Sequence, residues 1–247
     1  MMPKYILKNK KQKLEVKRKK IKYKTEPSVK IISFSVWGNE NKFLDGAIEN
    51  AILTKRIYGG GWTARFYCDE NISIDFVNKL KSLGSQVVLC KPQRGSWEGL
   101  FWRFYPASEG DVSVMISRDI DSRLNSREKY AVNEWLESDK GFHIMRDNYQ
   151  HDVPILGGMW GAKRGCITEM KSLIDLWTTF DRRGVDQDFL GQQIYPRVKN
   201  NSMIHDEIIG MNPALNWDEP TRRKWPKHPP IEWGGFVGDY IFNKVIT

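Results

Sequence analysis

From Lys30 onward, segments with strand character alternate with segments with helix character, and this order constrains the fold more than any other feature. The segment Lys30–Trp37 is rich in β-branched and aromatic residues, and Asp45–Tyr58 then carries apolar residues near helical spacing before three glycines. A second strand over Thr63–Cys68, a helix over about Ser73–Leu83 and a third strand over Gln86–Leu89 follow. This order predicts a single α/β domain of Rossmann-like type, with a mainly parallel mixed sheet flanked by helices.

The charge of the chain changes at about residue 28. Residues 1–30 hold 12 Lys/Arg against Glu15 and Glu26, so residues 31–247 carry a net charge of −1 although the whole chain carries +9. Few apolar residues accompany these lysines, so the segment cannot bury enough surface to offset the entropy lost on ordering. We therefore expect a flexible basic tail over residues 1–28 and one folded domain over residues 29–247.

Two interpretations of the basic tail are open: a polybasic contact with an anionic membrane or nucleic acid, and a solvated leader or linker. Specific nucleic-acid binding is not expected, because the basic excess stops where the folded pattern starts. Cys68, Cys90 and Cys166 lie far apart, without metal-ligand spacing, and suit a reducing compartment. No segment resembles a membrane span or a signal peptide. These features predict a cytoplasmic protein, with peripheral contact at a membrane surface as the open alternative.

The most informative motif is VSVMISRDIDSR, residues 112–123, in which an apolar strand is followed by Asp119 and Asp121. At extended spacing the two side chains would face opposite ways, but a strand that is turning can bring them together. Hard divalent cations take oxygen ligands, and Mg²⁺ is commonly held by one or two carboxylates plus substrate phosphates. Such a cation offsets negative charge on a leaving diphosphate. Two neighbouring acids also occur in solvated loops, so the position after a buried strand carries the interpretation.

With Asp-x-Asp at this position, the chain resembles the GT-A glycosyltransferases over about Lys30–Asp206, in particular the small enzymes of viral and bacterial polysaccharide assembly. The resemblance implies a Mn²⁺ or Mg²⁺ cofactor, a nucleotide-sugar donor and a glycan, protein or other hydroxyl acceptor. It also implies that Asp121 ligates the metal and that Asp119 contacts the metal or the ribose. The expected activity is hexosyl or pentosyl transfer.

The ends of the first strands deliver Ser35, Trp37 and Tyr67 to one rim of the sheet, where ligands of such folds gather. Under the resemblance these three residues are candidates for the nucleoside pocket. Arg103, within the aromatic stretch FWRFYP, occupies a place where such enzymes often have a basic residue facing the nucleotide or its phosphates. The alternative for Arg103 is a surface cation lying on a neighbouring aromatic ring.

The stretch LGGMWGAK, residues 156–163, combines paired glycines with Trp160. Glycines let the backbone approach a ligand closely, and an indole offers a flat face on which a sugar can stack. The resemblance places the donor and acceptor sugars here, against Gly158 and Trp160. A structural turn with a core tryptophan is the alternative.

The run VDQDFL, residues 185–190, is similar to one in several glycosyltransferases, where an acid at the start of the last helix lies near the acceptor. Asp188 could remove the acceptor proton or position the sugar, with Asp186 beside it, although acids at a helix start also serve as caps. Several GT-A families supply a late histidine as a third metal ligand, and His205 is the candidate here. A lone histidine is also a common structural hydrogen-bonding residue.

Two other functions fit parts of the pattern. A haloacid-dehalogenase-like phosphatase also places Asp-x-Asp after an apolar strand, but normally on the first strand and before a small residue and threonine, whereas Ser122 and Arg123 follow here. A catalytically silent nucleotide-sugar-binding module would keep the fold without turnover. The intact acids favour an active enzyme.

Overall fold

The computed structural model describes residues 29–38, 40–148, 151–207, 222–226 and 236–239. The basic tail predicted over residues 1–28 lies outside these described residues. The elements, in chain order, are β1 (Val29–Val36), α1 (Asn41–Leu53), the π-helix η1 (Thr54–Tyr58), β2 (Trp62–Asp69), α2 (Ile74–Ser82), β3 (Gln86–Cys90), α3 (Gly99–Trp102), the 3₁₀ helix η2 (Tyr105–Ser108), β4 (Val112–Arg118), α4 (Ser126–Glu137), β5 (Phe142–Arg146), β6 (Met159–Lys163), α5 (Met170–Leu176), α6 (Val185–Phe189), the π-helix η3 (Leu190–Ile194), α7 (Tyr195–Val198), the 3₁₀ helix η4 (Lys199–Asn201), β7 (Ser202–Asp206) and β8 (Arg222–Arg223).

The strands form one sheet in the order β3-β2-β1-β4-β6-β5-β7-β8. Within the described residues, β6 alone runs antiparallel to its neighbours, β4 and β5, and the other pairs are parallel. The predicted fold class, an α/β fold with a mainly parallel mixed sheet flanked by helices, is confirmed. The strand predicted over Thr63–Cys68 and the helix predicted over Ser73–Leu83 match β2 and α2 to within one residue at each end.

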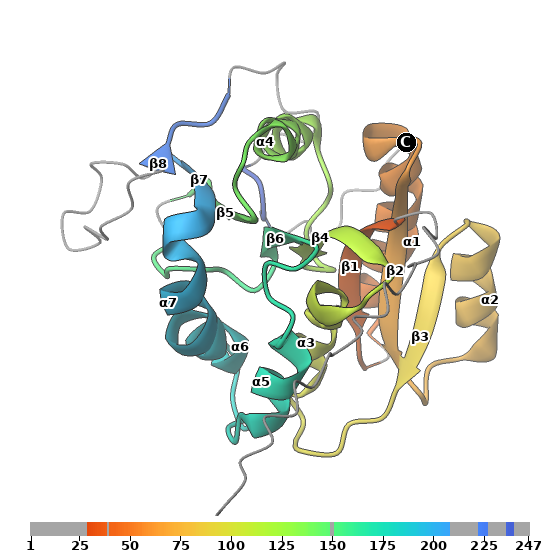
Figure 1. The fold of residues 1–247 in the computed structure, drawn as a ribbon. Helices are drawn as coiled ribbons and strands as arrows, with labels where there is room; N and C mark the ends of the chain where they lie inside the picture. The colour runs from red at the N-terminus through yellow and green to blue at the C-terminus, as the bar shows by residue number, and fades with distance from the viewer. Residues whose placement is uncertain (1–28, 39, 149–150, 208–221, 227–235, 240–247) are drawn as a thin grey trace, which may run out of the picture.

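Apolar side chains cover both faces of the sheet and make two main cores. Along β1, Ile31 packs on one face with residues of α3, α5, α6 and α7, while Ile32, Phe34 and Val36 pack on the other with α1, α2 and α4. Figure 1 shows these two groups of helices on opposite sides of the sheet. Because side chains alternate along a strand, Ser35 faces the same side as Ile31, toward α3.

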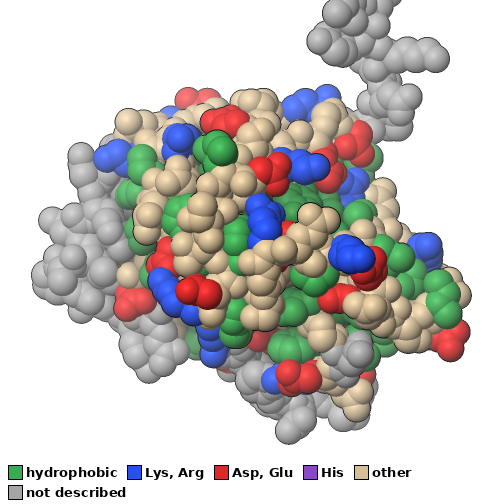
Figure 2. Space-filling view, turned by 90° about the horizontal axis from the view of Figure 1, so that it is seen from below, with side chains coloured by type: hydrophobic (Ala, Val, Ile, Leu, Met, Phe, Trp, Pro, Cys, Tyr) green, Lys and Arg blue, Asp and Glu red, His purple; other side chains and the backbone are tan. Residues whose placement is uncertain are grey.

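None of the helices in the described residues is long and apolar enough to span a bilayer. On the face drawn in Figure 2, basic and acidic side chains are interspersed with apolar ones, and neither sign of charge dominates. The described surface in this view therefore offers no broad region of one charge to a membrane or to nucleic acid.

Candidate active site

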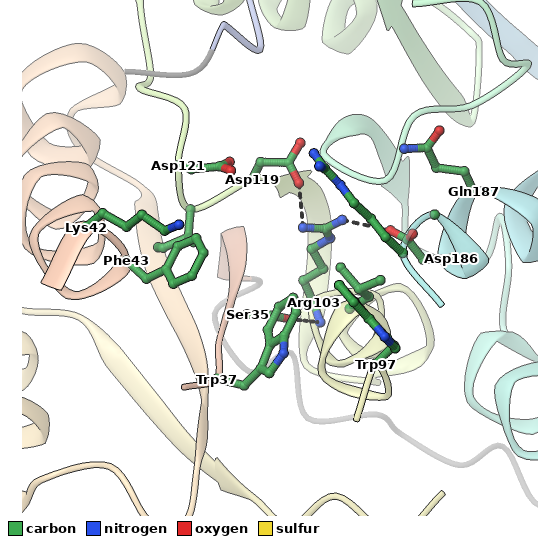
Figure 3. A pocket seen from close by; sticks show the side chains of 14 residues that line it. Ser35, Trp37, Lys42, Phe43, Trp97, Arg103, Asp119, Asp121, Asp186 and Gln187 are labelled. Carbon is green, nitrogen blue, oxygen red and sulfur yellow. Dashed lines mark hydrogen bonds and ion pairs between the residues drawn. The ribbon is translucent and has the colours of Figure 1, made fainter. Parts of the chain in front are cut away.

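A cavity of about 460 Å³ lies at the carboxyl ends of β1 and β4 and is also lined by residues of α1, α3 and α6. Figure 3 shows acids, bases and aromatic rings of several elements directed toward one space. The charged and aromatic residues that line it are Asp119, Asp121, Asp186, Lys42, Arg103, Arg183, Trp37, Phe43 and Trp97. The carboxyl ends of β1 and β4 therefore meet at one hollow, which is where ligand sites of open α/β sheets are expected.

Arg103 lies at the centre of the charged groups. It caps the carboxyl end of α3, and its backbone N–H donates to Ser35 Oγ at 3.0 Å, which ties the residue to the end of β1. Its guanidinium donates to Asp119 Oδ1 at 2.6 Å and to Asp186 Oδ2 at 2.9 Å (Figure 3). Burial lowers the pKa of Arg103, but the surrounding carboxylates raise it by more, so the side chain stays charged.

Asp119 and Asp121 follow β4 on a loop that α1 holds in place. The side chain of Asn50 in α1 donates to the carbonyl of Ser122 at 2.9 Å and accepts from the backbone N–H of Leu124 at 3.2 Å. With the chain turning beyond the end of β4, both carboxylates line the same cavity. Both acids of the Asp-x-Asp motif therefore reach the same hollow.

Ionisation of Asp121 is made less favourable by its burial and by the neighbouring Asp119. The pKa of Asp121 rises to about 6, because burial and then the adjacent charge of Asp119 outweigh the opposing charges of Arg103 and Arg183. A carboxylate that repels its neighbour is stabilised by any added positive charge. The pair is therefore suited to a cation.

Asp186 and Asp188 lie in different surroundings, although both belong to α6. Asp186 lines the cavity and its side chain is 3% exposed, whereas Asp188 forms an ion pair with Arg182 and is not part of the lining. Burial raises the pKa of Asp186 against the opposing effect of Arg103. The geometry thus brings Asp186 to the site and leaves Asp188 outside the cavity wall.

Gly157 and Gly158 pass directly behind the charged groups. A Cβ atom at Gly157 would collide with the carboxylate of Asp186 and the guanidinium of Arg103, and one at Gly158 would collide with the carboxylate of Asp119. The close backbone approach expected of paired glycines is present, but it is made to side chains of this chain. Only glycine leaves room for the observed arrangement.

Two residues predicted to contact the donor face the core instead. Trp160 is fully buried, with its ring stacked on Phe142 and edge-on to Phe104, so it offers no face to a sugar. Tyr67 is also buried, and its hydroxyl donates to Glu109 at 2.8 Å. Neither lines the cavity, because strand alternation turns both side chains into the packing between sheet and helices.

His205 lies on β7, apart from the Asp-x-Asp pair. Its ring nitrogens contact His143 at 2.8 Å and Glu134 at 3.2 Å, and the residue does not line the cavity. Burial lowers its pKa. Among the described residues, no group of three or more His, Cys, Asp or Glu side chains is arranged to hold a metal ion, so the acid pair is not joined by the histidine proposed as a third ligand.

Several lining residues were not among the candidates named from the sequence. Lys42 and Phe43 come from the first turn of α1, Trp97 precedes α3, and Arg183 precedes α6. Each stands at the start of a helix that follows a strand or loop of the predicted rim. That position was a usable signal for Lys42 and Phe43, because they follow β1 within a few residues.

No protein-family model matches the sequence, and no curated protein sequence is similar to it. Among solved structures, the chain is similar to the mannosyltransferase PcManGT from Pyrobaculum calidifontis in complex with GDP-Man and Mn²⁺, at 12% identity and a TM-score of 0.45, over 75% of this chain and 56% of that one. It is also similar to glucosyl-3-phosphoglycerate synthase from Mycobacterium tuberculosis in complex with phosphoglyceric acid, at 11% and 0.44, over 72% and 68%. A cytidylyltransferase from Leptospira borgpetersenii matches at 13% and 0.43, over 72% and 76%.

The chain spans little more than half of the mannosyltransferase. At these identities and TM-scores the likeness says nothing about chemistry. The chemistry is therefore inferred from the residues of the cavity.

Proposed function

We propose that this protein is a metal-dependent glycosyltransferase, which moves a sugar from a nucleoside-diphosphate sugar to a hydroxyl group of an acceptor. The observation that carries the proposal is that Asp119 and Asp121 line the same cavity as Arg103. The guanidinium of Arg103 is hydrogen-bonded to Asp119 and to Asp186. Breaking a sugar-phosphate bond builds negative charge on the departing diphosphate. The cavity combines a site for a cation with a fixed guanidinium, and both would offset that charge.

The acid pair fits a hard divalent cation such as Mn²⁺ or Mg²⁺. It supplies carboxylate oxygens from two residues, and Asp121 is held at a raised pKa by burial and by its neighbour. Mg²⁺ sites commonly use one or two carboxylates and complete the shell with water and substrate phosphates, so a third protein ligand is not required. When bound, the cation would neutralise charge on the diphosphate.

The other lining residues divide the cavity into a charged part and an aromatic part. Arg103 is placed to contact phosphate oxygens, since its guanidinium has five donors and two are bonded to Asp119 and Asp186. Trp37 lies flat against Gly99, where a Cβ atom would collide with the indole ring. We assign Ser35 and Trp37 to the nucleoside side of the cavity, in keeping with their place at the end of β1.

For activation of the acceptor we assign Asp186 in preference to Asp188. Asp186 lines the cavity and has a raised pKa, which makes its carboxylate a stronger base than a solvated one. In this role an Oδ atom of Asp186 accepts the proton of the acceptor hydroxyl. Asp188 forms an ion pair with Arg182 and takes no part in this role.

The test is to incubate the full chain with Mn²⁺ and a panel of UDP-, GDP-, CDP- and dTDP-sugars and to measure free nucleoside diphosphate. We expect slow hydrolysis of one donor class, abolished by EDTA. Asp121→Asn should lower the rate by about 100-fold or more, because it removes one charged ligand of the cation. Asp139→Asn is the matched control, since Asp139 is an exposed acid in the turn before β5.

Three results would contradict the proposal. Turnover that is unaffected by EDTA and by Asp121→Asn would remove the cation from the chemistry. Release of inorganic phosphate from simple phosphoesters, without release of nucleoside diphosphate, would favour a phosphatase. Binding of a nucleotide-sugar without any release would leave a silent binding module.

A further inference from the structure

The backbone of Gly157 and Gly158 forms the wall against which the three central side chains rest. Asp186 and Arg103 lie against Gly157, and Asp119 lies against Gly158, each close enough to exclude a Cβ atom. A small movement of this backbone would therefore release or displace all three side chains. Whatever holds the two peptides in place also holds the charged groups.

Two adjacent residues of β4 hold these glycines through their carbonyl oxygens. Ser117 Oγ donates to Gly157 O at 2.7 Å, and Arg118 Nη1 donates to Gly158 O at 2.5 Å. The backbone pairing of β4 with β6 ends at Arg118 opposite Met159. Beyond the end of this strand pairing, the two side chains therefore supply hydrogen bonds to the carbonyl groups of Gly157 and Gly158.

Arg118 is itself fixed by a buried chain of polar contacts. Its Nη2 lies 2.9 Å from Glu128 Oε2 in α4, and Glu128 Oε1 accepts from the hydroxyl of Tyr58 in η1 at 2.5 Å. The side chains of Arg118 and Glu128 are 1% and 0% exposed. Breaking such a pair leaves a buried charge without its partner, so the guanidinium has a strong preference for one position.

We infer that Ser117 and Arg118 are positioning residues of the site, acting through the carbonyl oxygens of Gly157 and Gly158. The part of this inference that concerns turnover rests on the proposed glycosyl transfer. Neither residue lines the cavity. They set the place of Asp119, Arg103 and Asp186 by fixing the wall behind them, as outer partners of a metal site fix its ligands.

The test is Ser117→Ala, with Ser113→Ala as the matched control. Ser113 lies near the other end of the same strand, and its hydroxyl also donates to a backbone carbonyl, that of Val29, at 3.1 Å. We expect Ser117→Ala to weaken Mn²⁺ binding, measured by calorimetric titration, by about tenfold and to lower kcat by about 10- to 100-fold. Ser113→Ala should leave both within about twofold, as a change remote from the site.

Calorimetry also separates positioning from a loss of folded protein. Irreversibly misfolded protein lowers the number of Mn²⁺ ions bound per chain at unchanged affinity, whereas a displaced wall lowers the affinity of a chain that circular dichroism shows to be fully folded. Where Ser117→Ala does not fold, Tyr58→Phe replaces it, since this change removes the hydroxyl that bonds Glu128 and keeps the ring. Mn²⁺ affinity equal to wild type in a folded Ser117→Ala or Tyr58→Phe variant would overturn the inference.

A second measurement does not depend on transfer or on metal. The ¹⁵N–¹H resonances of the Arg103 guanidinium, assigned by their loss in Arg103→Lys, should be slowly exchanging in wild type, because the group is buried between two acids. Ser117→Ala should shift and broaden them, and Ser113→Ala should not. Unchanged resonances in Ser117→Ala would overturn the inference. If the resonances respond as expected but the wild-type protein shows neither Mn²⁺ binding nor turnover, the proposed function is overturned instead.

Discussion

Two buried charge clusters beside the same sheet have opposite compositions. In the Arg103 cluster, one base lies between two acids, Asp119 and Asp186. In the Asp206 cluster, one acid lies between two bases, with Oδ2 of Asp206 at 2.7 Å from Arg146 and 2.9 Å from Arg222.

The clusters differ most in their access to solvent. Asp119 in the Arg103 cluster has a side chain that is 35% exposed and lines the cavity, whereas in the Asp206 cluster Arg146 and Asp206 are fully buried, Arg222 is 16% exposed and none of the three lines the cavity. Arg146 also donates to the carbonyl of Pro154 at 2.7 Å, which adds a backbone partner. A cluster that opens onto a cavity can take up a ligand, while a sealed one holds strands together. Buried charge therefore marks a site only where a cavity reaches it.

The largest expected effect comes from breaking the sealed cluster. Asp206→Ala should lower the free energy of unfolding by about 3–5 kcal/mol, because it removes a fully buried carboxylate that forms ion pairs with two arginines. Urea denaturation followed by circular dichroism measures this loss, with Asp139→Ala as an exposed control. A loss below about 1 kcal/mol would mean that the two clusters do not differ in their structural role.

A change in the Arg103 cluster, which opens onto the cavity, should reduce activity more than it reduces stability. Arg103→Gln should lower the rate of nucleoside diphosphate release by about 100- to 1000-fold, since it removes a fixed positive group at the departing diphosphate. Its cost in unfolding free energy should be smaller than that of Asp206→Ala, because water in the cavity reaches Asp119 and because Asp186, whose pKa burial already raises, can take up a proton. Arg197→Gln, on the exposed face of α7, serves as the control. A larger stability loss than for Asp206→Ala would reverse the comparison.

A third test uses the pKa of Asp121, which stands at about 6. The ionised form binds a cation, so Mn²⁺ affinity should rise as the pH increases through this value and should be about tenfold lower at pH 5 than at pH 7. Calorimetric titration across this range measures the effect. Asp121→Asn should flatten the profile between these two values, and a profile that stays unchanged in this variant would assign the titration to another group.

The smallest effect on the site is expected from His205. His205→Gln should leave Mn²⁺ affinity within about twofold of wild type, because the ring contacts Glu134 and His143 away from the cavity. It should lower the free energy of unfolding by about 1 kcal/mol, because it disrupts the hydrogen bonds of the ring nitrogens. A tenfold loss of Mn²⁺ affinity would instead restore His205 as a ligand and weaken the distinction between open and sealed polar groups.

Local sequence patterns predicted the elements of the fold well where apolar periodicity and glycines mark both ends. The helix expected over Asp45–Tyr58 is an α-helix that begins earlier, at Asn41, and ends as a π-helix at Tyr58. The sequence predicts no strand over Met159–Lys163, where β6 lies, but a segment that contacts the sugars or, alternatively, a structural turn. The strand character of β6 depends on pairing with β4 and β5, which are distant in sequence and leave no local signal.

For the site, residues at strand ends were easier to predict than the direction of their side chains. Asp119, Asp121, Ser35 and Trp37 line the cavity, as their places at strand ends led us to expect. Arg103, which the family resemblance suggested, lines it too. Trp160 and Tyr67 do not, because the parity of each strand and the helix packed on it decide which face a ring takes. The partners of His205 come from α4 and β5, so no pattern around the histidine indicates that they are present.

The guanidinium of Arg103 is shared, and this sharing makes the two acids dependent on each other. A ligand that attracts Asp119 leaves Asp186 with a larger part of the guanidinium's hydrogen bonding, and a ligand on Asp186 does the same for Asp119. By thermodynamic linkage the two influences are equal in size. A ligand bound at Asp119 would therefore change the affinity for a ligand at Asp186 through the Arg103 side chain alone, without any movement of the domain.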